Sequence, residues 1–504
     1  MKQYLKVVIV GTGFGGLGQA IQLEKAGIRD YLVLEKADDV GGTWRDNSYP
    51  GCECDVESHL YSLSYEQKPD WSRNFAARSE IFAYLSNIAD KHRLRSKIRF
   101  GVGLTAATWE PDRCRWRLNT TTGEELWCQF LISAVGGLHV PRLPELPGIE
   151  TFTGPVWHSS QWNHDFDFAG KRVAVIGTGA SGIQLVPPIA ADAAKLYVFQ
   201  RTPHWVLPKR NRDVPGWQRV LFKYIPGVQR VYRNRIYWRR EMRALAFNGR
   251  LELWKGPESI AKQHIARHIK DSALREKLTP KYTMGCKRVL FSNDYYPALA
   301  RDNVELITDS VADVRAGSVV DASGVEREID AIIYATGFRI TDALDYLHII
   351  GTDRRFLAEE WATGGMRAHL GTTVAGFPNM FFLLGPNTAV THTSVIFMLE
   401  AQARYVVNAI RLVDNSGAAA LDVRRDVQEG FQTTIQQKLV KGVWTRGGCT
   451  NIYHDAAGVN RAIWPGFTWQ FWLATRRVRR EDYRLLHRAP QDRRLEASES
   501  TPAR

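Results

Sequence analysis

The chain has 504 residues, 44% of them hydrophobic and 24% charged, which is ordinary for a globular protein of two to four domains. Much of its net charge of +14 lies in residues 230–243 and in an Arg-rich C-terminal tail, which favours solvated basic faces, and we find no nucleic-acid-binding module. Six scattered Cys are too few for a disulfide scaffold, and neither a secretory signal nor a membrane-spanning helix is predicted, so we expect reduced thiols and a cytoplasmic location.

The first predicted element is a nucleotide-binding loop between a buried strand and a helix. The run VVIVGTGFGGLGQAIQLEKAG places Gly11, Gly13 and Gly16 in G-x-G-x-x-G spacing. Such glycines allow a tight turn and let a pyrophosphate approach the backbone N–H groups at the helix start. Glu35 ends the next strand, YLVLE, where a carboxylate accepts hydrogen bonds from a ribose diol and would repel a 2′-phosphate. The loop therefore predicts a site for FAD.

Two unusual segments precede the next loop. Residues 41–55 read GGTWRDNSYPGCECD, and Cys52 and Cys54 are too closely spaced for the dithiol of a disulfide reductase, so buried or half-buried structural Cys are expected. Residues 152–165 read FTGPVWHSSQWNHD and follow a Pro-rich stretch, residues 137–148, that favours extended or turn backbone. Aromatic residues and a lone His thus occupy a position where only a linker is expected.

A second nucleotide-binding loop follows in KRVAVIGTGASGIQLVPPIA, where Gly177, Gly179 and Gly182 repeat the spacing of the first. At the position equivalent to Glu35 the charge is inverted, because Arg201 stands there in YVFQRTPHW. A guanidinium forks onto phosphate oxygens, so this loop predicts a site that prefers NADP to NAD. An ordinary surface Arg is the alternative interpretation of Arg201. Together the two loops predict an α/β fold with two doubly wound Rossmann-like domains.

Residues 211–281 predict a helical insertion in the second domain. Apolar residues recur there at helical spacing, followed by Pro226-Gly227 and then by a basic run. We expect amphipathic helices that pack on the second domain; docking to a membrane surface and lining an apolar substrate entrance are the alternatives. The apolar residues are Trp217, Val220, Leu221, Tyr224 and Ile225.

The order of the motifs resembles that of one known family. Residues 152–162 match the pattern F-x-G-x-x-x-H-x-x-x-W, and residues 41–55 match Gly-Gly-x-Trp followed by an aromatic residue, Pro, Gly and Asp. The runs GCKRVLFSNDYYPALARDNVEL, YATGF and GFPNMFFLLGPNT follow in order. From about residue 5 to residue 475 the chain resembles a Baeyer–Villiger monooxygenase, a class B flavoprotein that uses FAD and NADPH. The matching fingerprint residues are Phe152, Gly154, His158 and Trp162.

The resemblance implies roles for individual residues. Asp55 would lie beside the flavin ring, and Lys287 and Arg288 match a Lys-Arg pair of which the Arg is catalytic. Asn163 departs from the Pro or Asp of the fingerprint, and Ile452 stands where many relatives carry a Trp near the nicotinamide. The predicted catalytic residues are Asp55, Arg288 and Lys287. The predicted cofactor-binding residues are Gly11, Gly13, Gly16, Glu35, Gly42, Trp44, Gly177, Gly179, Gly182, Arg201, Thr202, Gly385 and Asn387, and no metal site is predicted.

The family reaction would insert one oxygen atom from O2 next to the carbonyl of a small ketone, giving an ester or lactone through a C4a-peroxyflavin. In the family the segment with His158 and Trp162 is a linker that couples the two cofactor domains. One alternative is a monooxygenase of the same fold that oxygenates nitrogen or sulfur nucleophiles, and another is an NADPH oxidase that releases only H2O2. A structural ion pair is the alternative interpretation of Asp55 and Arg288.

The two loops also predict the domain organisation, in which the NADP domain is inserted into the FAD domain. We expect the strand within EIDAIIYATGF, residues 328–338, to return to the first domain and close it. The C-terminal tail, HRAPQDRRLEASESTPAR, is expected to be disordered on composition. The predicted boundaries are 1–145 and 338–504 for the FAD domain, 146–210 and 282–337 for the linker and NADP domain, and 211–281 for the helical insertion.

Overall fold

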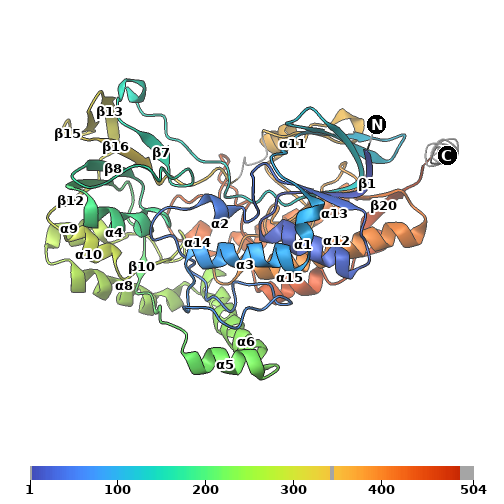
Figure 1. Ribbon diagram of the computed structural model, residues 1–504, viewed down its shortest axis with the longest axis horizontal. Coiled ribbons are helices and arrows are strands. Elements are labelled where there is room, and N and C mark those ends of the chain that lie inside the picture. Colours follow the sequence, from blue (N-terminus) through green and yellow to red (C-terminus); the bar gives the residue numbers. More distant parts are fainter. Residues whose placement is uncertain (1–2, 341–345, 489–504) are drawn as a thin grey trace.

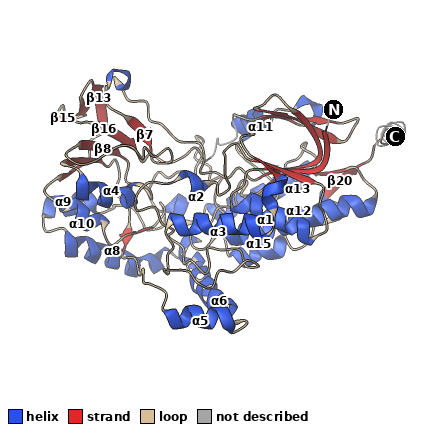
Figure 2. Ribbon diagram, in the orientation of Figure 1, coloured by secondary structure: helices blue, strands red, loops and turns tan. Residues whose placement is uncertain are grey.

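The computed structural model describes residues 3–340 and 346–488, so nearly all of the C-terminal tail lies outside the described residues. Figure 1 shows two lobes side by side, each with its own sheet, and a helical hairpin that projects below them. Figure 2 shows that most helices lie below the two sheets in this view. We call the lobe whose sheet contains the N-terminal strand the first lobe, and the lobe with the other large sheet the second lobe.

The sheet of the first lobe has eight strands in the order β17-β4-β5-β6-β1-β2-β3, with β18 also paired to β6. β1 is parallel to β2 and β6, whereas β5 is antiparallel to both β4 and β6. β1 is buried almost throughout, as its run of β-branched residues predicts. The strands are β1 (Gln3–Val10), β2 (Tyr31–Leu34), β3 (Ile98–Arg99), β4 (Leu104–Glu110), β5 (Arg115–Thr120), β6 (Glu125–Ser133), β17 (His348–Ile350) and β18 (Met380–Phe382).

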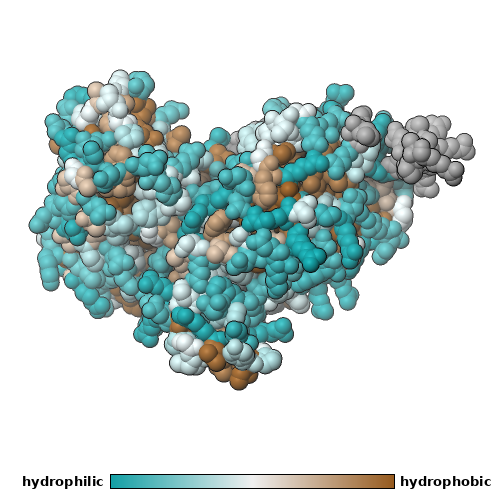
Figure 3. All heavy atoms as spheres, viewed as in Figure 1, coloured by the Kyte–Doolittle hydropathy of each residue, from teal (hydrophilic) through white to brown (hydrophobic). Residues whose placement is uncertain are grey.

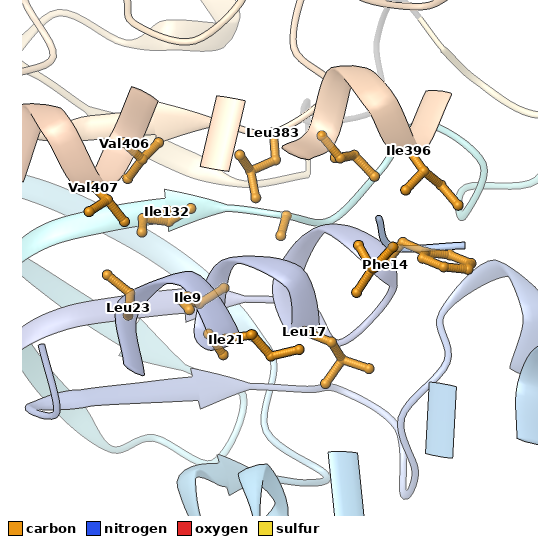
Figure 4. Packing of buried hydrophobic residues seen from close by; sticks show 14 of the residues in the cluster. Ile9, Phe14, Leu17, Ile21, Leu23, Ile132, Leu383, Ile396, Val406 and Val407 are labelled. Atoms are coloured by element: carbon orange, nitrogen blue, oxygen red, sulfur yellow. The ribbon is translucent and has the colours of Figure 1, made fainter. Parts of the chain in front are cut away.

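The core of the first lobe lies where helix α1 (Phe14–Lys25) packs between β1 and helix α12 (Val395–Ser416). Figure 4 shows Leu17 and Ile21 of α1 in the same layer as Ile9 of β1, with α12 above them. Each fully buried aliphatic side chain contributes about 1.5–3 kcal/mol, so this layer fixes α1 and the loop that precedes it. The other elements of the lobe are α2 (Thr43–Asp46), α3 (Arg78–Lys91), η1 (Leu94–Lys97), η4 (Thr352–Arg354), α11 (Leu357–Gly364), β19 (Ala420–Val423), α13 (Arg425–Leu439), α14 (Val443–Arg446), α15 (Thr468–Ala474), η5 (Arg480–Asp482) and β20 (Tyr483–Leu486).

The second lobe is built on a five-stranded parallel sheet in the order β12-β9-β8-β16-β7, and α4 follows β8 as α1 follows β1. The predicted fold class, two doubly wound units, is thereby confirmed; the domain boundaries stay predictions. The elements are η2 (Ile149–Thr151), β7 (Val156–His158), β8 (Arg172–Ile176), α4 (Gly182–Asp192), β9 (Lys195–Phe199), β10 (Val206–Leu207), β11 (Leu290–Phe291), α10 (Tyr295–Leu299), β12 (Val304–Ile307), β13 (Val311–Arg315), β14 (Ser318–Asp321), β15 (Glu326–Glu328) and β16 (Ala331–Tyr334).

The expectation that the strand in residues 328–338 closes the first lobe is wrong. β16 lies between β8 and β7 in the second sheet, where Ile333 pairs with Val175 on one side and Trp157 on the other. The first sheet instead receives β18 beside β6. A short strand of four buried apolar residues carries no sign of which sheet it will join, because either interior would accept it.

Helices fill most of residues 216–278, but the apolar stripe of α5 does not pack on the second lobe, and the bounds of the insertion stay a prediction. Trp217, Val220 and Tyr224 of α5 are 70%, 57% and 66% exposed, so the favoured packing interpretation is wrong for this helix. The insertion consists of α5 (Gly216–Tyr224), α6 (Val228–Glu241), α7 (Ala244–Phe247), η3 (Leu251–Trp254), α8 (Lys255–His268) and α9 (Ser272–Leu278).

The hairpin of α5 and α6 is held to the first lobe around His59. The buried ring of His59 meets Phe222 edge-on at 4.8 Å and Tyr232 at 5.4 Å between centroids. Gln229 donates a hydrogen bond from Nε2 to Nδ1 of His59 at 3.2 Å, and Arg233 donates to the carbonyl of His59 at 2.8 Å. A ring nitrogen that accepts a hydrogen bond carries no proton, so this anchor requires a neutral His59.

Two residue-level searches were negative for residues 3–340 and 346–488. None of their helices combines the length and the apolar character needed to cross a bilayer. None of their His, Cys, Asp and Glu side chains form a group of three or more that could hold a metal ion.

The stability of the protein is expected to fall as His59 is protonated. Burial, helped by the charges of Arg233 and Lys68, lowers the pKa of His59 from 6.5 to about 4. Between these values the unfolded chain binds a proton that the folded chain does not, so the free energy of unfolding decreases as the pH falls from 6.5 towards 4. Urea unfolding of wild type and His59→Phe at pH 7 and pH 5 measures this, and the wild type should lose about 2 kcal/mol more than the variant.

The matched control is His348→Phe, which replaces an exposed His of the first lobe. It should lose stability with falling pH as the wild type does. Equal losses for wild type and His59→Phe would contradict a neutral, anchoring His59.

Candidate active site

The first phosphate loop is shaped by two glycines and left open by a third. Gly11 has φ +103°, and a Cβ there would lie 2.7 Å from the carbonyl oxygen of Ala134. A Cβ on Gly16 would lie 1.8 Å from the oxygen of Gly11. Gly13, by contrast, has only Gly42 within 4 Å of its Cβ position, and no side chain caps α1 at this residue. The backbone N–H groups at the start of α1 therefore face space that an anion can enter.

The second phosphate loop repeats this arrangement. Gly177 has φ +108° and packs against the carbonyl of Ala335 after β16, where a Cβ would come within 2.5 Å. A Cβ on Gly182 would lie 2.4 Å from the oxygen of Gly177, whereas Gly179 has nothing within 4 Å. No side chain caps α4. In both loops the outer glycines are required by backbone packing, and the middle glycine leaves room for a ligand.

Glu35 lies buried beside the first loop and is tied to it. Its Oε2 accepts hydrogen bonds from the backbone N–H and the hydroxyl of Thr12 at 3.0 and 2.5 Å. Its Oε1 accepts from the N–H of Ala37 and pairs with Arg45 at 3.2 Å. The carboxylate is thus held at the end of β2 next to the loop, the position at which a ribose diol is read in such folds.

Residues 41–55 connect the two lobes. The indole of Trp44 donates to the hydroxyl of Tyr61 at 3.2 Å within the first lobe. Tyr49 donates from its hydroxyl to Oε1 of Gln184 in α4 at 2.9 Å, and Gln184 donates back to the carbonyl of Glu53 at 2.9 Å. The helix of the second phosphate loop is therefore attached to the segment that faces the first.

Three acidic residues at every second position of residues 53–57 each pair with a basic residue from the second lobe or its insertion. The bases come from three elements: the stretch after β10, the stretch before β11, and α6. We call these three ion pairs the interlobe clasp. Its pairs are Glu53–Lys209 at 2.5 Å, Asp55–Arg288 at 2.7 Å, and Glu57–Arg240.

The central pair of the clasp, Asp55–Arg288, is bidentate. Arg288 donates from Nε to Oδ2 of Asp55 at 2.9 Å, and from Nη2 to Oδ1 and Oδ2 at 2.8 and 2.7 Å. Arg288 is the most accessible of the three bases, with 46% of its side chain exposed against 3% for Lys209 and 5% for Arg240. The basic side chains of two pairs are thus buried, whereas Arg288 is held in a fixed orientation but remains accessible to solvent.

The charges around this pair keep it ionised. Burial opposes the ionisation of Asp55, but the charge of Arg288 and its hydrogen bonds hold the pKa of that carboxyl below its ordinary value. Asp55 in turn raises the pKa of Arg288. Arg240 donates to the carbonyl of Asp55 at 3.0 Å, and the hydroxyl of buried Tyr453, whose pKa is raised by burial, also faces the pair. The motifs did not single out Lys209, Arg240 or Tyr453.

A cavity of about 800 Å³ lies beside Lys287, the residue before Arg288 in the chain. Arg201 and Thr202 line it together with Lys281 and Lys287, so cations dominate its wall. Burial and the charge of Arg201 lower the pKa of Lys287. A cluster of cations in which the charge of one lowers the pKa of another favours an anion such as a phosphate.

The structure therefore places the three predicted catalytic residues at two different positions. Asp55 and Arg288 meet, as predicted, but Lys287 lines the cavity with Arg201 and lies over the ring of Tyr282 at 5.5 Å. Lys287 and Arg288 are adjacent in the chain, but the first lines the cavity and the second pairs with Asp55.

The fingerprint segment is not a loose linker, because it supplies β7 to the second sheet. The ring of His158 is 1% exposed; its Nε2 donates to the carbonyl of Gly337 at 3.0 Å, and its Nδ1 bonds to Ser160 at 2.8 Å. Burial lowers the pKa of His158. A Nε2 that donates to a carbonyl fixes the tautomer, so His158 joins the fingerprint to the loop after β16 as a neutral ring.

The other fingerprint residues fill the surroundings of β7. Trp162 stacks on Phe168 with ring centroids 5.9 Å apart and approaches Tyr49 at 6.4 Å. A Cβ on Gly154 would lie 2.5 Å from the oxygen of Asp330 and 2.7 Å from the ring of Phe152. These residues place the fingerprint between the 41–55 segment and the second sheet.

Comparison with protein families matches residues 4–347 to the family described as flavin-binding monooxygenase-like. The chain belongs to this family. A member with two phosphate loops and an oriented, accessible Arg between them has the parts that a flavin monooxygenase requires.

Individual relatives confirm the resemblance to Baeyer–Villiger monooxygenases. Proteins named Baeyer-Villiger monooxygenase from Streptomyces coelicolor and Pseudomonas aeruginosa are 44% and 45% identical, covering 99% and 96% of this chain and 96% and 92% of their own. The crystal structure of cyclohexanone monooxygenase from Rhodococcus sp. Phi1 bound to NADP+ has a TM-score of 0.87 at 27% identity, and the match covers 97% of this chain and all of that one.

Two residues that the resemblance assigned to the flavin hold the C-terminal part of this family member together. A Cβ on Gly385 would lie 2.3 Å from the oxygen of Gly371. The side chain of Asn387 is buried, with φ +56°, and donates to the carbonyls of Asn460 and Ile463, both at 3.1 Å. The Asn387 side chain is thus occupied, so a flavin contact by this residue, still a prediction, would have to come from its backbone.

The two departures from the family pattern lie in different settings. Asn163 accepts a hydrogen bond from the N–H of Asp165 at 3.1 Å, a turn that Asp would form equally well. Ile452 is 56% exposed and adjoins Tyr453, which faces Arg288. The first departure preserves local structure, and the second leaves an exposed apolar side chain where the resemblance predicted a Trp.

The expectation of reduced thiols is wrong for one pair. Cys286 and Cys449, 163 residues apart, form a disulfide that joins the segment before Lys287 to the loop that lines the cavity. No local spacing motif marks such a pair, so only the fold brings the two together. Cys52 and Cys54 are free, and burial raises their pKa to about 11 and about 12, as expected for structural thiols.

The disulfide predicts the number of reactive thiols. Denatured without reductant, the protein should titrate four thiols, and after reduction six, because Cys52, Cys54, Cys114 and Cys128 are not part of the disulfide. Cys449→Ser should lower the unfolding midpoint, since a loop this long is worth up to about 4–5 kcal/mol in the chain-entropy description. Titration of six thiols before reduction would contradict the bond.

Proposed function

We propose that Arg288, held by Asp55, is the catalytic cation of this monooxygenase, which uses FAD, NADPH and O2 to insert an oxygen atom next to the carbonyl of a small ketone. The observation that carries the proposal is the openness of Arg288, the one base of the clasp with a half-exposed guanidinium. If the Asp55–Arg288 pair were only structural, its basic side chain would be expected to be buried, as Lys209 and Arg240 are. The cytoplasmic location stays a prediction from sequence.

The described residues fit both cofactors. The open Gly13–Gly42 face at the start of α1 fits a pyrophosphate, and Glu35 fits the ribose of FAD. Gly179 at the second loop and the cationic cavity with Arg201 fit NADPH and its 2′-phosphate. When bound, FAD takes up hydride from NADPH and reacts with O2 to supply the oxygen atom.

The role of Arg288 is to place positive charge where negative charge develops on the reacting oxygen. Its hydrogen bonds to both oxygens of Asp55 fix the guanidinium plane, so no reorganisation is needed during the reaction. Because Asp55 stays ionised, it holds Arg288 without exchanging a proton with it. Asp55 is therefore a positioning residue and Arg288 the catalytic one.

We assign Lys287 to cofactor binding rather than to catalysis. It lines the cavity with Arg201 and Thr202, and burial together with the charge of Arg201 lowers its pKa, so a charged Lys287 is disfavoured there without an anion. A phosphate between Lys287 and Arg201 would remove that repulsion.

The alternatives are not favoured. Oxygenation of nitrogen or sulfur nucleophiles requires no cation to stabilise an anionic oxidant, yet Arg288 is oriented and open. An H2O2-producing oxidase would have no use for it either. Product analysis on a ketone and a thioether side by side distinguishes the two oxygenases, and 18O2 incorporation for each NADPH distinguishes both from an oxidase.

Arg288→Ala is expected to keep FAD and consume NADPH but release H2O2 in place of ester. A cation about 4 Å from the developing charge, at an effective dielectric near 20, contributes ~4 kcal/mol, or about three powers of ten in rate, and solvent at this half-exposed site reduces that figure. Ester yield and H2O2 per NADPH measure it. Arg288→Lys should retain part of the ester yield, and Asp55→Asn should lose less than Arg288→Ala.

The control is Arg477→Ala, an exposed Arg of the first lobe, which should make ester as the wild type does. If Arg288→Ala forms ester at the wild-type rate, Arg288 is a structural partner and the proposal fails.

Arg201→Gln is expected to raise the KM for NADPH by about one to two powers of ten and leave that for NADH nearly unchanged. A charge-assisted hydrogen bond contributes about 1.5–3 kcal/mol, and the other cations that line the cavity, Lys277, Lys281 and Lys287, place the result towards the lower end. Lys287→Gln should shift the ratio in the same direction. Steady-state kinetics with both cofactors measure this, with Lys262→Gln on exposed α8 as control; equal losses with NADH would refute a 2′-phosphate contact.

A further inference from the structure

The tip of the α5–α6 hairpin presents an unusual apolar surface to solvent. Figure 1 shows the hairpin projecting below both lobes, and Figure 3 shows hydrophobic atoms gathered at this lowest point of the molecule. We call this surface the tip. Its residues and exposed fractions are Trp217 at 70%, Val220 at 57%, Tyr224 at 66%, Ile225 at 50% and Val231 at 69%.

The orientation of α5 follows from one buried residue. Phe222 is 7% exposed and packs against Tyr232 at 5.2 Å and against His59 of the first lobe at 4.8 Å. Trp217, Val220 and Tyr224 recur at steps of three and four, so they share one helix face that is distinct from that of Phe222. Anchoring α5 through Phe222 therefore turns the larger apolar stripe outwards, away from the cavity beside Arg201.

The charges around the tip all have one sign. Residues 214–240 contain no Asp or Glu but carry seven basic residues. Arg233 and Arg240 are buried and serve the anchor and the clasp. Lys223, Arg230 and Arg235 are exposed, and no carboxylate pairs with them in the part of the chain that the structure describes.

We propose that the tip docks on the surface of a bilayer that contains anionic phospholipids. A convex apolar tip with Trp and Tyr matches the interfacial zone, where the rings bury their apolar bodies and keep their polar groups in water. The cations around it match phosphate headgroups, and an anionic surface attracts such clusters. A second copy of the chain would bring like charges together, since the exposed charged residues of α5 and α6 are all basic.

Docking of this kind lies on the membrane and does not cross it. The apolar face spans only α5 and the start of α6, two short helices that meet at Gly227 with φ +85°. The phosphate loops precede α1 and α4, which lie in the lobes above the hairpin, so a docked tip does not cover them (Figure 1).

The test is co-sedimentation of the full-length, FAD-loaded protein with vesicles of phosphatidylcholine alone and of phosphatidylcholine with phosphatidylglycerol. Wild type should bind the anionic vesicles at least about tenfold more strongly, and high salt should release it. The triple variant Trp217→Ser, Tyr224→Ser, Ile225→Ser should lose binding to both by at least about tenfold, as buried apolar area scales with affinity. Blue-shifted tryptophan fluorescence on vesicle addition should disappear with it.

The charge variant Lys223→Glu, Arg230→Glu, Arg235→Glu isolates the electrostatic part. Each basic residue near an anionic surface is worth about fivefold in partitioning, so loss of three attractions should weaken binding to anionic vesicles by roughly a hundredfold. The matched controls are Val440→Ser, an exposed apolar residue elsewhere at 61%, and Lys262→Glu in α8; both should bind as the wild type does.

Unchanged FAD content and NADPH oxidation in all variants show that the fold is intact, since none of the altered residues lies in the catalytic or cofactor-binding group. Failure of wild type to sediment with anionic vesicles overturns the proposal, as does wild-type binding by the apolar variant. A lipid-free dimer that the apolar variant dissociates in analytical ultracentrifugation would make the tip an interface between copies, which also overturns it.

Discussion

The interlobe clasp is the interaction on which the active site depends. The acids at residues 53, 55 and 57 meet bases from three other elements, so neither lobe can shift without leaving a charge unpaired. Breaking a buried pair costs about 3–5 kcal/mol, because the remaining charge has lost its partner and cannot regain water. The closed pairs at Lys209 and Arg240 thus fix the position at which Arg288 stays open. The distance between the phosphate loops follows from the same contacts.

The sequence predicted the parts of the site that depend on local chemistry. Glycine spacing identifies the loops because backbone packing excludes a Cβ at Gly11 and Gly182, and the meeting of Asp55 with Arg288 followed from family motifs. It could not assign β16 to a sheet, since four buried apolar residues fit either interior. Lys209, Arg240 and the Cys286–Cys449 bond were missed because each joins segments far apart in the chain, and no local pattern marks them.

The stripe on α5 shows a different limit. Helical periodicity shows that apolar residues share a face, but it does not show which way the face points. That direction was decided by Phe222 and its contact with His59, a residue more than 150 positions away. Phe222 fixed the orientation of α5 because only its face of the helix has a partner surface within reach. The exposed apolar residues of the tip remain in solvent as a consequence.

Residues 286–288 bring these constraints together. Cys286 is bonded to Cys449, Lys287 lines the cavity beside Arg201, and Arg288 is held by Asp55. Three consecutive side chains therefore connect the loop of Cys449, the cavity beside Arg201 and the ion pair with Asp55. Because the disulfide fixes one end and the ion pair the other, a phosphate that draws Lys287 towards Arg201 acts on a short segment with little freedom to absorb the shift. If Lys287 shifts towards Arg201, the shift reaches the guanidinium of Arg288 through adjacent peptide bonds.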